Sequence, residues 1–221
     1  MGRDARSPSA TAPLLVVVLV SASCLPLTRP DSYGSYAELS AHEREGVDYE
    51  VTVADRSAPV AVFAIHGGAI DVGTHLIAES LAGSDWSLYV FKGKKPRGNW
   101  SLHITSAHFD EPRALALAAK SARCVSIHGH QSEVPRVCVG GVDRALRERV
   151  TRTLADSGLS FKTIELCPGF EGTAVTNIAN QCRDGVQLEF SSRLREMLFS
   201  DRALLDRTVS VIRGAVAPAP P

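Results

Sequence analysis

The sequence predicts an α/β protein with one central sheet, mixed or parallel, that is covered by helices. Short runs rich in β-branched and aromatic residues alternate with amphipathic stretches from Tyr49 onward, which is the pattern of strands joined by helices. The chain has 221 residues, 44% of them apolar, which is enough to bury one core without dividing it. No internal repeat appears. We therefore expect a single domain over residues 49–213.

Seven runs have the composition and length of strands, and the run from Val60 to Ile65 is apolar throughout, as a buried strand is. The expected strands cover residues 49–53, 59–65, 87–91, 123–127, 136–139, 159–164 and 186–190.

Five other stretches carry apolar residues at helical spacing. The expected helices cover residues 74–81, 111–121, 143–157, 192–199 and 201–213. Asp143 and Ser191 stand at the starts of two of them. Both are good N-cap residues, because their side-chain oxygens accept hydrogen bonds from free backbone N–H groups of the first turn.

The first 23 residues have the layout of a secretory signal peptide. Arg3 and Arg6 precede an apolar run from Leu14 to Val20, which small residues follow. The run is too short for a membrane span of roughly 20 residues. We therefore expect a secreted or cell-envelope protein. Cys24 is a candidate lipid-accepting cysteine of a bacterial lipoprotein, although Ser21 stands where such a site normally has Leu.

The ends of the mature chain have little periodicity. Residues 24–48 are expected to form a leader, and the Pro- and Ala-rich residues 214–221 are expected to be a disordered tail. The formal net charge is +0, so no overall field directs the protein to nucleic acid or to an anionic membrane. No feature specifies an oligomer, and a monomer is the default. A local basic cluster suits either a rim over an anionic substrate or a solvated loop; it comprises Lys92, Lys94, Lys95 and Arg97.

The cysteines of the predicted mature domain form an even set, which favours disulfides outside the cytoplasm. No C-x-x-C pair occurs, which argues against a thiolate zinc site. Cys167 and Cys182 flank a loop rich in Gly, Thr and Asn, and are candidates for a bridge that restrains it. Cys124 and Cys138 lie in predicted strands and either pair or pack as free thiols. Four cysteines allow three pairings, and the sequence does not choose among them.

Two of the expected strands run directly into a His-Gly dipeptide, at His66 and at His128. Ligand sites in open α/β sheets lie beyond the carboxyl ends of the strands. Hydrolytic zinc sites usually take two histidines and one carboxylate and keep a fourth position open. Asp71 supplies the carboxylate if the glycines after His66 let the loop bend tightly. His130 is an alternative to His128.

A carboxylate outside the ligand set is also needed, to take a proton from water and deliver it to the leaving amine. Glu189 is the candidate, because the period of two in its strand puts Gln187 and Glu189 on one unusually polar face. A structural ion pair would explain Glu189 equally well.

Several motifs occur in one order between Tyr36 and Leu198: HEREGVDYEV, IHGGAIDVGTHLIAESLAG, SLYVFKG, LHITSAHFDEPRALAL, VSIHGH, VCVGGVD and GVQLEFS. Together they resemble the poly-γ-glutamate hydrolases first known from bacteriophage, and their bacterial relatives. The resemblance implies a mixed central sheet with helices on both faces, an open sandwich of the zinc carboxypeptidase type.

The same resemblance implies Zn²⁺ held by His66, Asp71 and His128, with Glu189 as the catalytic glutamate. One departure is that the family carries Glu where this chain has Asp71. The shorter side chain either draws the loop inward or weakens metal binding.

Four weaker candidates for substrate binding are His103, Arg113, Asn177 and Asn180. An arginine can hold a carboxylate of a γ-glutamyl chain through two parallel hydrogen bonds. A surface arginine at a helix start, or asparagines bonded to turn backbone, would explain these residues equally well.

The expected function is therefore exported, zinc-dependent hydrolysis of γ-glutamyl amide bonds in a polymer or peptide. A cell-wall amidase or γ-D-glutamyl peptidase shares this chemistry. A non-catalytic secreted binding module with the same fold is the alternative from another class. An α/β-hydrolase esterase is disfavoured, because no G-x-S-x-G nucleophile motif occurs.

Overall fold

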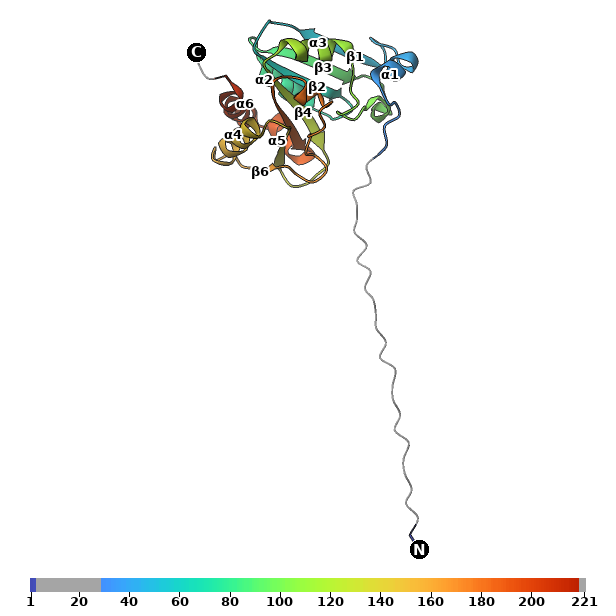
Figure 1. Ribbon diagram of the computed structural model, residues 1–221, viewed down its shortest axis with the longest axis vertical. Helices are drawn as coiled ribbons and strands as arrows, with labels where there is room; N and C mark the ends of the chain where they lie inside the picture. The colour runs from blue at the N-terminus through green and yellow to red at the C-terminus, as the bar shows by residue number, and fades with distance from the viewer. Residues whose placement is uncertain (3–28, 219–221) are drawn as a thin grey trace. The chain divides into compact units, whose positions relative to one another are not determined.

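A seven-stranded sheet lies at the centre of the computed structural model, which describes residues 1–2 and 29–218 (Figure 1). The predicted signal run from Leu14 to Val20 and the candidate lipid site Cys24 lie outside the described residues, as do residues 219–221. The strands are β1 (Tyr49–Ala54), β2 (Val60–Gly68), β3 (Ser87–Gly93), β4 (Arg123–His130), β5 (Arg136–Gly140), β6 (Lys162–Glu165) and β7 (Asp184–Ser191).

The strand order is β1-β3-β2-β4-β7-β5-β6. The neighbours among β3, β2, β4 and β7 are parallel. β1 is antiparallel to β3, β5 is antiparallel to β7, and β6 is parallel to β5. The sheet is therefore mixed. The carboxyl ends of β2, β4 and β7 meet at one edge, where the predicted site residues stand.

Both faces of the sheet are buried. In β2, Val62 and Ala64 belong to one hydrophobic core, while Phe63 and Ile65 belong to a second core on the other face. Because both faces are covered, β2 is apolar without alternation. Burying a side chain such as Phe63 contributes about 1.5–3 kcal/mol relative to leaving it exposed.

Helices cover the two faces, as predicted. The first core contains buried residues of α2 (Thr74–Ala82), α4 (Arg144–Ala155), α5 (Ser192–Ser200) and α6 (Arg202–Val216). The second core contains residues of α1 (Tyr36–His42), α3 (Pro112–Lys120) and the 3₁₀ turns Asn99–Leu102 and Ile178–Asn180. Asp143 and Ser191 cap α4 and α5, accepting hydrogen bonds from the backbone N–H groups three residues on, at 3.1 and 3.2 Å.

The structure adds order at both ends of the predicted domain. Helix α1 lies within the segment expected as a leader; Ser35 caps it, and Leu39 is fully buried in the second core. Helix α6 includes Gly214 to Val216, which the sequence assigned to the tail, because Ala215 and Val216 are buried in the first core.

The candidate bridge between Cys167 and Cys182 is wrong. The disulfides are Cys124–Cys182 and Cys138–Cys167, with Cα–Cα distances of 5.6 and 5.7 Å. Cys167 follows β6, which lies beside the β5 strand of Cys138, and Cys182 precedes β7, which lies beside the β4 strand of Cys124. Each end of the loop between β6 and β7 is therefore joined to a neighbouring strand. A bridge across the loop does not occur.

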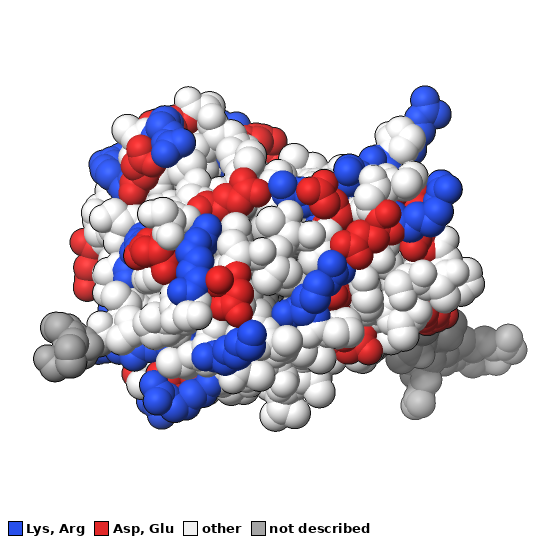
Figure 2. Space-filling view, turned by 90° about the horizontal axis from the view of Figure 1, so that it is seen from above, with Lys and Arg blue, Asp and Glu red and all other residues white. Residues whose placement is uncertain are grey.

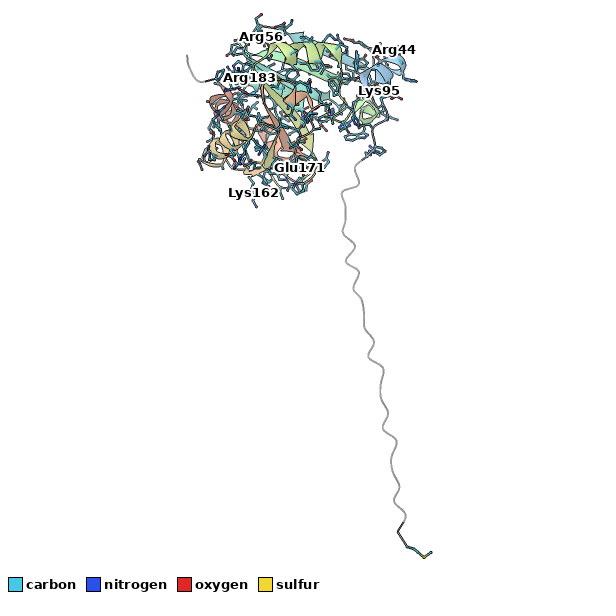
Figure 3. All side chains as sticks on the ribbon, in the orientation of Figure 1. Arg44, Arg56, Lys95, Lys162, Glu171 and Arg183 are labelled. Carbon is cyan, nitrogen blue, oxygen red and sulfur yellow. A yellow bond between two sulfur atoms is a disulfide. The ribbon has the colours of Figure 1, made fainter. Side chains whose placement is uncertain are left out.

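The surface carries no single dominant charge on the face shown in Figure 2, where basic and acidic side chains are interspersed. In the predicted basic cluster, Lys94 pairs with Glu50 at 3.2 Å, and Lys95 pairs with Glu43 beside α1 (Figure 3). Much of the cluster's charge is thus neutralised. No helix among the described residues has the length and apolar character needed to cross a membrane.

Candidate metal centre

Three predicted side chains converge at the carboxyl ends of two adjacent parallel strands. His66 lies in β2, His128 lies in β4, and Asp71 lies on the turn after β2. One ligand atom from each lies within 4.8 Å of the others. His66 and His128 are each only 2% exposed, which protects any bound ion from bulk water.

Hydrogen bonds decide which imidazole nitrogens face the cluster. Nε2 of His66 donates to the carbonyl of Ile104 at 2.8 Å, which leaves Nδ1 as the nitrogen that faces the cluster. Nε2 of His128 bonds to the Ser126 hydroxyl at 2.7 Å. The two Nδ1 atoms are 3.1 Å apart. Nitrogen ligands of a tetrahedral zinc ion lie roughly 3.3 Å apart, so the histidine pair fits this metal.

The turn after β2 brings Asp71 back to His66. The Asp71 N–H donates to the His66 carbonyl at 2.8 Å. Gly68 has φ +67°, and a Cβ there would lie 2.3 Å from the Gly93 carbonyl oxygen, so only glycine fits this turn. Asp71 Oδ2 lies 3.5 Å from His66 Nδ1 and accepts from the Gly129 N–H at 3.3 Å. The shorter carboxylate therefore reaches the cluster.

Asp71 is ionised in this environment. Burial opposes its negative charge, but the close contact with His66 and the interactions with the neighbouring imidazoles outweigh it and lower the pKa of the carboxyl group. Burial, together with the neighbouring His66, lowers the pKa of His128 well below the usual range, so that ring is neutral and able to bind a cation.

Glu189 stands next to the cluster on β7. Its register partner on β4 is His128, and the residue is 6% exposed. Burial first, and then the negative charge of Asp71, raise the pKa of Glu189 to about 8. No ion pair among residues 29–218 includes Glu189. Among the described residues, its side chain accepts one hydrogen bond, from the Gln187 amide at 3.0 Å.

The weaker candidates differ in their surroundings. His103 stacks on His66 with a ring-centroid distance of 4.0 Å, and its Nδ1 bonds to Asp31 at 2.6 Å. Arg113 lies at the start of α3 and binds Glu45 and Glu111 through hydrogen bonds of 2.7–2.9 Å. Only His103 among these two contacts a member of the metal cluster.

The two asparagines lie in the loop before β7. Asn177 donates to the Gln187 side chain at 2.7 Å, and the Gln187 amide in turn donates to Glu189. Asn180 donates to the carbonyls of Gly172 and Ala174, both at 2.8 Å, and thereby closes the loop. Asn177 is linked to the catalytic candidate, whereas Asn180 is bonded to backbone.

Arg195 of α5 was not predicted and binds three segments of the site. Its guanidinium donates to the carbonyls of Val72 at 2.9 Å, of His130 at 3.4 Å and of Phe190. These carbonyls adjoin the segments that carry Asp71, His128 and Glu189. The sequence offered one signal, an arginine on a helix that follows the site strand directly, but its buried position depends on the folded strand order.

The comparisons with known proteins agree with this geometry. A family model described as poly-gamma-glutamate hydrolase matches residues 33–213. The chain belongs to this family. It is 35% identical over 199 residues to the UPF0714 protein YndL of Bacillus subtilis (strain 168), and the match covers 89% of this chain and 78% of YndL.

Solved structures of this family also match. The bacteriophage poly-gamma-glutamate hydrolase has a TM-score of 0.77 and 30% identity, over 84% of this chain and 96% of that one. A structure described as zinc-free YndL in its apo form has a TM-score of 0.76 and 34% identity, over 84% and 97% of the chains. The family and the open α/β sandwich fold, both predicted from the sequence, are confirmed. The protein is therefore assigned to the hydrolases.

Proposed function

We propose that this poly-γ-glutamate hydrolase family member is an exported, zinc-dependent enzyme that cleaves γ-glutamyl amide bonds. The observation that carries the proposal is the convergence of the two histidine Nδ1 atoms and the Asp71 carboxylate beside Glu189. The zinc-free description of the related YndL structure supports zinc as the metal.

The donor set suits a catalytic ion. His66, His128 and Asp71 supply two nitrogens and one oxygen, which leaves a tetrahedral ion one open position. Zinc, when bound, supplies a Lewis acid that activates water and polarises the amide carbonyl. The hydrogen bonds to Ile104 and Ser126 hold the two rings with Nδ1 inward, as outer contacts of metal ligands do.

Glu189 performs the proton transfers. Its carboxylate takes a proton from the attacking water and then gives it to the leaving nitrogen, so the amine departs neutral. A carboxyl group with a raised pKa holds that proton between the two transfers, and the positive charge of a bound ion would bring the group back toward the carboxylate form. Gln187, held by Asn177, orients the carboxylate.

Export is part of the proposal. The signal layout of residues 1–23 and the two disulfides support an extracytoplasmic location, because disulfides persist in oxidising compartments. The lipid-accepting role of Cys24 is a variant of the same proposal. Mass spectrometry of the mature amino terminus distinguishes an unmodified Cys24 from a lipid-modified one.

The test is metal analysis of the purified mature protein together with assays on poly-γ-glutamate and on peptidoglycan fragments. We expect about one zinc per chain and cleavage of poly-γ-glutamate. His66→Ala should abolish both, whereas His42→Ala, which removes an exposed histidine on α1, should change neither. Full zinc occupancy in His66→Ala would overturn the ligand assignment. Cleavage of peptidoglycan fragments alone would instead indicate a cell-wall enzyme.

A further inference from the structure

Arg136 lies one strand away from Glu189, on the same face of the sheet. It begins β5, which is antiparallel to β7, and the register pairs Cys138 with Glu189. Since side chains alternate along a strand, Arg136 shares the face of Cys138 and hence of Glu189. Its backbone N–H donates to the Ser191 hydroxyl at 3.1 Å, which holds it beside the end of β7.

The charge of Arg136 is unpaired within the described part of the chain. Arg113, Arg123 and Arg147 each have a carboxylate oxygen within 3.2 Å. None of the ion pairs in residues 29–218 includes Arg136. Its Nε donates to His130, and its two terminal amino groups make no hydrogen bond to the described residues. The residue is half-buried, so its guanidinium is held beside the site with two donors free.

His130 orients the Arg136 guanidinium. Nε2 of His130 accepts from Arg136 Nε at 3.2 Å, so the proton of the neutral ring is on Nδ1. Nδ1 is buried and has no hydrogen-bond partner among the described residues.

Phe170 and Lys162 adjoin His130 and Arg136. Phe170 packs on the His130 ring with a centroid distance of 4.8 Å. It belongs to the loop between β6 and β7, which the Cys138–Cys167 disulfide joins to β5. Lys162, which is labelled in Figure 3, is exposed and is the register partner of Arg136 on β6, so it adds a second positive charge on the neighbouring strand.

We propose that Arg136 and His130 form a carboxylate subsite, which binds the free α-carboxylate of a γ-glutamyl unit adjoining the cleaved bond. The inference rests on the proposed function. A γ-linked glutamate chain keeps one free α-carboxylate on every unit, because the amide uses the side-chain carboxyl. The terminal amino groups of Arg136 bind the two oxygens in parallel, and His130, which accepts from the Arg136 Nε–H, holds the guanidinium in that orientation. The subsite makes the enzyme selective for γ-linked glutamate over neutral amides.

The experiment compares two synthetic γ-linked oligoglutamates that differ only in their α groups, one with free carboxylates and one with primary amides. The zinc-loaded wild type should prefer the carboxylate substrate. Arg136→Gln should lower kcat/KM on that substrate about 10- to 100-fold, mainly through KM, and change the amidated substrate little. Arg136→Lys should recover part of the loss. Arg152→Gln, which removes an exposed arginine from α4 on the opposite face, is the control and should match the wild type.

A second measurement separates failure of the subsite from failure of the proposed function. Calorimetric binding of γ-glutamylglutamate is measured with wild type and Arg136→Gln at matched zinc content and melting temperature. Cleavage of both substrates with an equal loss in Arg136→Gln would overturn the subsite and leave the function standing. Binding that depends on Arg136 without any cleavage would overturn the function and support the subsite. Neither binding nor cleavage would overturn both.

Discussion

The two histidines of the candidate metal centre owe their geometry to contacts on their outer nitrogens. His66 is fixed by a backbone carbonyl, and His128 by a serine two residues earlier on its own strand. Neither partner titrates near neutral pH, so both rings keep Nδ1 directed at the cluster over a wide pH range. Asp71 is the least constrained member, because only a hydrogen bond of 3.3 Å from Gly129 orients it besides the contact with His66.

Asp71→Ala should weaken zinc binding by more than the roughly 10- to 100-fold that loss of an outer contact of a ligand costs. It removes the only carboxylate of the cluster, whereas Asp71→Glu keeps a carboxylate and should retain the metal. Competition with a calibrated chelator measures both dissociation constants. Equal zinc affinity in wild type and Asp71→Ala would mark Asp71 as a loop carboxylate outside the ligand set.

Glu189→Gln should keep zinc and lose most turnover, on the order of 100- to 10,000-fold, the usual contribution of a general acid-base group. The amide preserves volume and one acceptor but does not carry the proton. Zinc content and kcat at saturating substrate are measured on the same preparation. Near-normal turnover would remove Glu189 from the mechanism, and loss of zinc would make it a ligand.

The pairing of strands β4 and β7 positions His128 and Glu189 next to each other. The strands pair in parallel without a break from Arg123 and Asp184 to His130 and Ser191, which sets His128 beside Glu189. A slip of one residue in either strand would turn its site residue to the opposite face. Arg195 donates to backbone carbonyls at the carboxyl ends of both strands. Its guanidinium fits there because Gly129 has no side chain.

Gly129→Ala should displace Arg195, because the added Cβ would lie 2.2 Å from Nη1 and 2.6 Å from Cζ of the guanidinium. The displaced arginine leaves buried carbonyls without donors, so we expect a stability loss of about 2–3 kcal/mol and weaker zinc binding. Denaturant unfolding and the zinc dissociation constant are the measurements. Gly214→Ala in α6, where a Cβ meets nothing within 4 Å, is the control and should not destabilise. In an Arg195→Ala background the cost of Gly129→Ala should largely vanish; a cost that persisted would place the strain elsewhere.

Local sequence patterns predicted most of the helices and strands. Long-range contacts explain where the observed bounds differ from the predicted ones. The apolar residues of β2 end at Ile65, but the strand continues to Gly68 because its backbone still pairs with β3. The predicted strand over residues 159–164 includes Leu159 and Phe161, but β6 begins at Lys162. These two residues pack against the first core from outside the strand. Helix α1 was missed because a single fully buried side chain, Leu39, gives no helical period.

The candidate site residues were likewise predictable where they depend on local sequence features. His66, His128 and Asp71 follow from strand ends and a glycine turn, which are local features. The roles of Gln187 and Arg195 depend on which strands become neighbours, and no spacing in the sequence reports that order.

At the scale of the whole molecule, two disulfides fasten the loop that carries Asn177 and Phe170. One bridge closes a sequence separation of 58 residues and the other of 29. The longer bridge spans β4 to the start of β7. The shorter one stands beside Glu189, because Cys138 is the register partner of that residue.

Removing the bridges one at a time should therefore separate stability from activity. Replacing Cys124 and Cys182 by Ser should cost slightly more unfolding free energy than replacing Cys138 and Cys167, by about 0.6 kcal/mol for a twofold longer loop, each loss being about 4 kcal/mol. The variant that lacks Cys138 and Cys167 should show the larger fall in kcat. Unfolding curves and kcat at matched zinc content test this, and the reverse ranking in activity would show that the loop does not depend on the shorter bridge.

The pairing of the cysteines also has a consequence for biosynthesis. The native bridges are nested, with Cys138 and Cys167 inside the loop closed by Cys124 and Cys182. An unfolded chain closes short loops most readily, and the shortest among these four cysteines are those between Cys124 and Cys138, 14 residues apart, and between Cys167 and Cys182, 15 residues apart. Those two bridges together use up all four thiols and exclude both native ones. For a chain exported as proposed, we therefore expect the yield of active protein to depend on thiol–disulfide exchange, catalysed by a disulfide isomerase in the compartment that receives it.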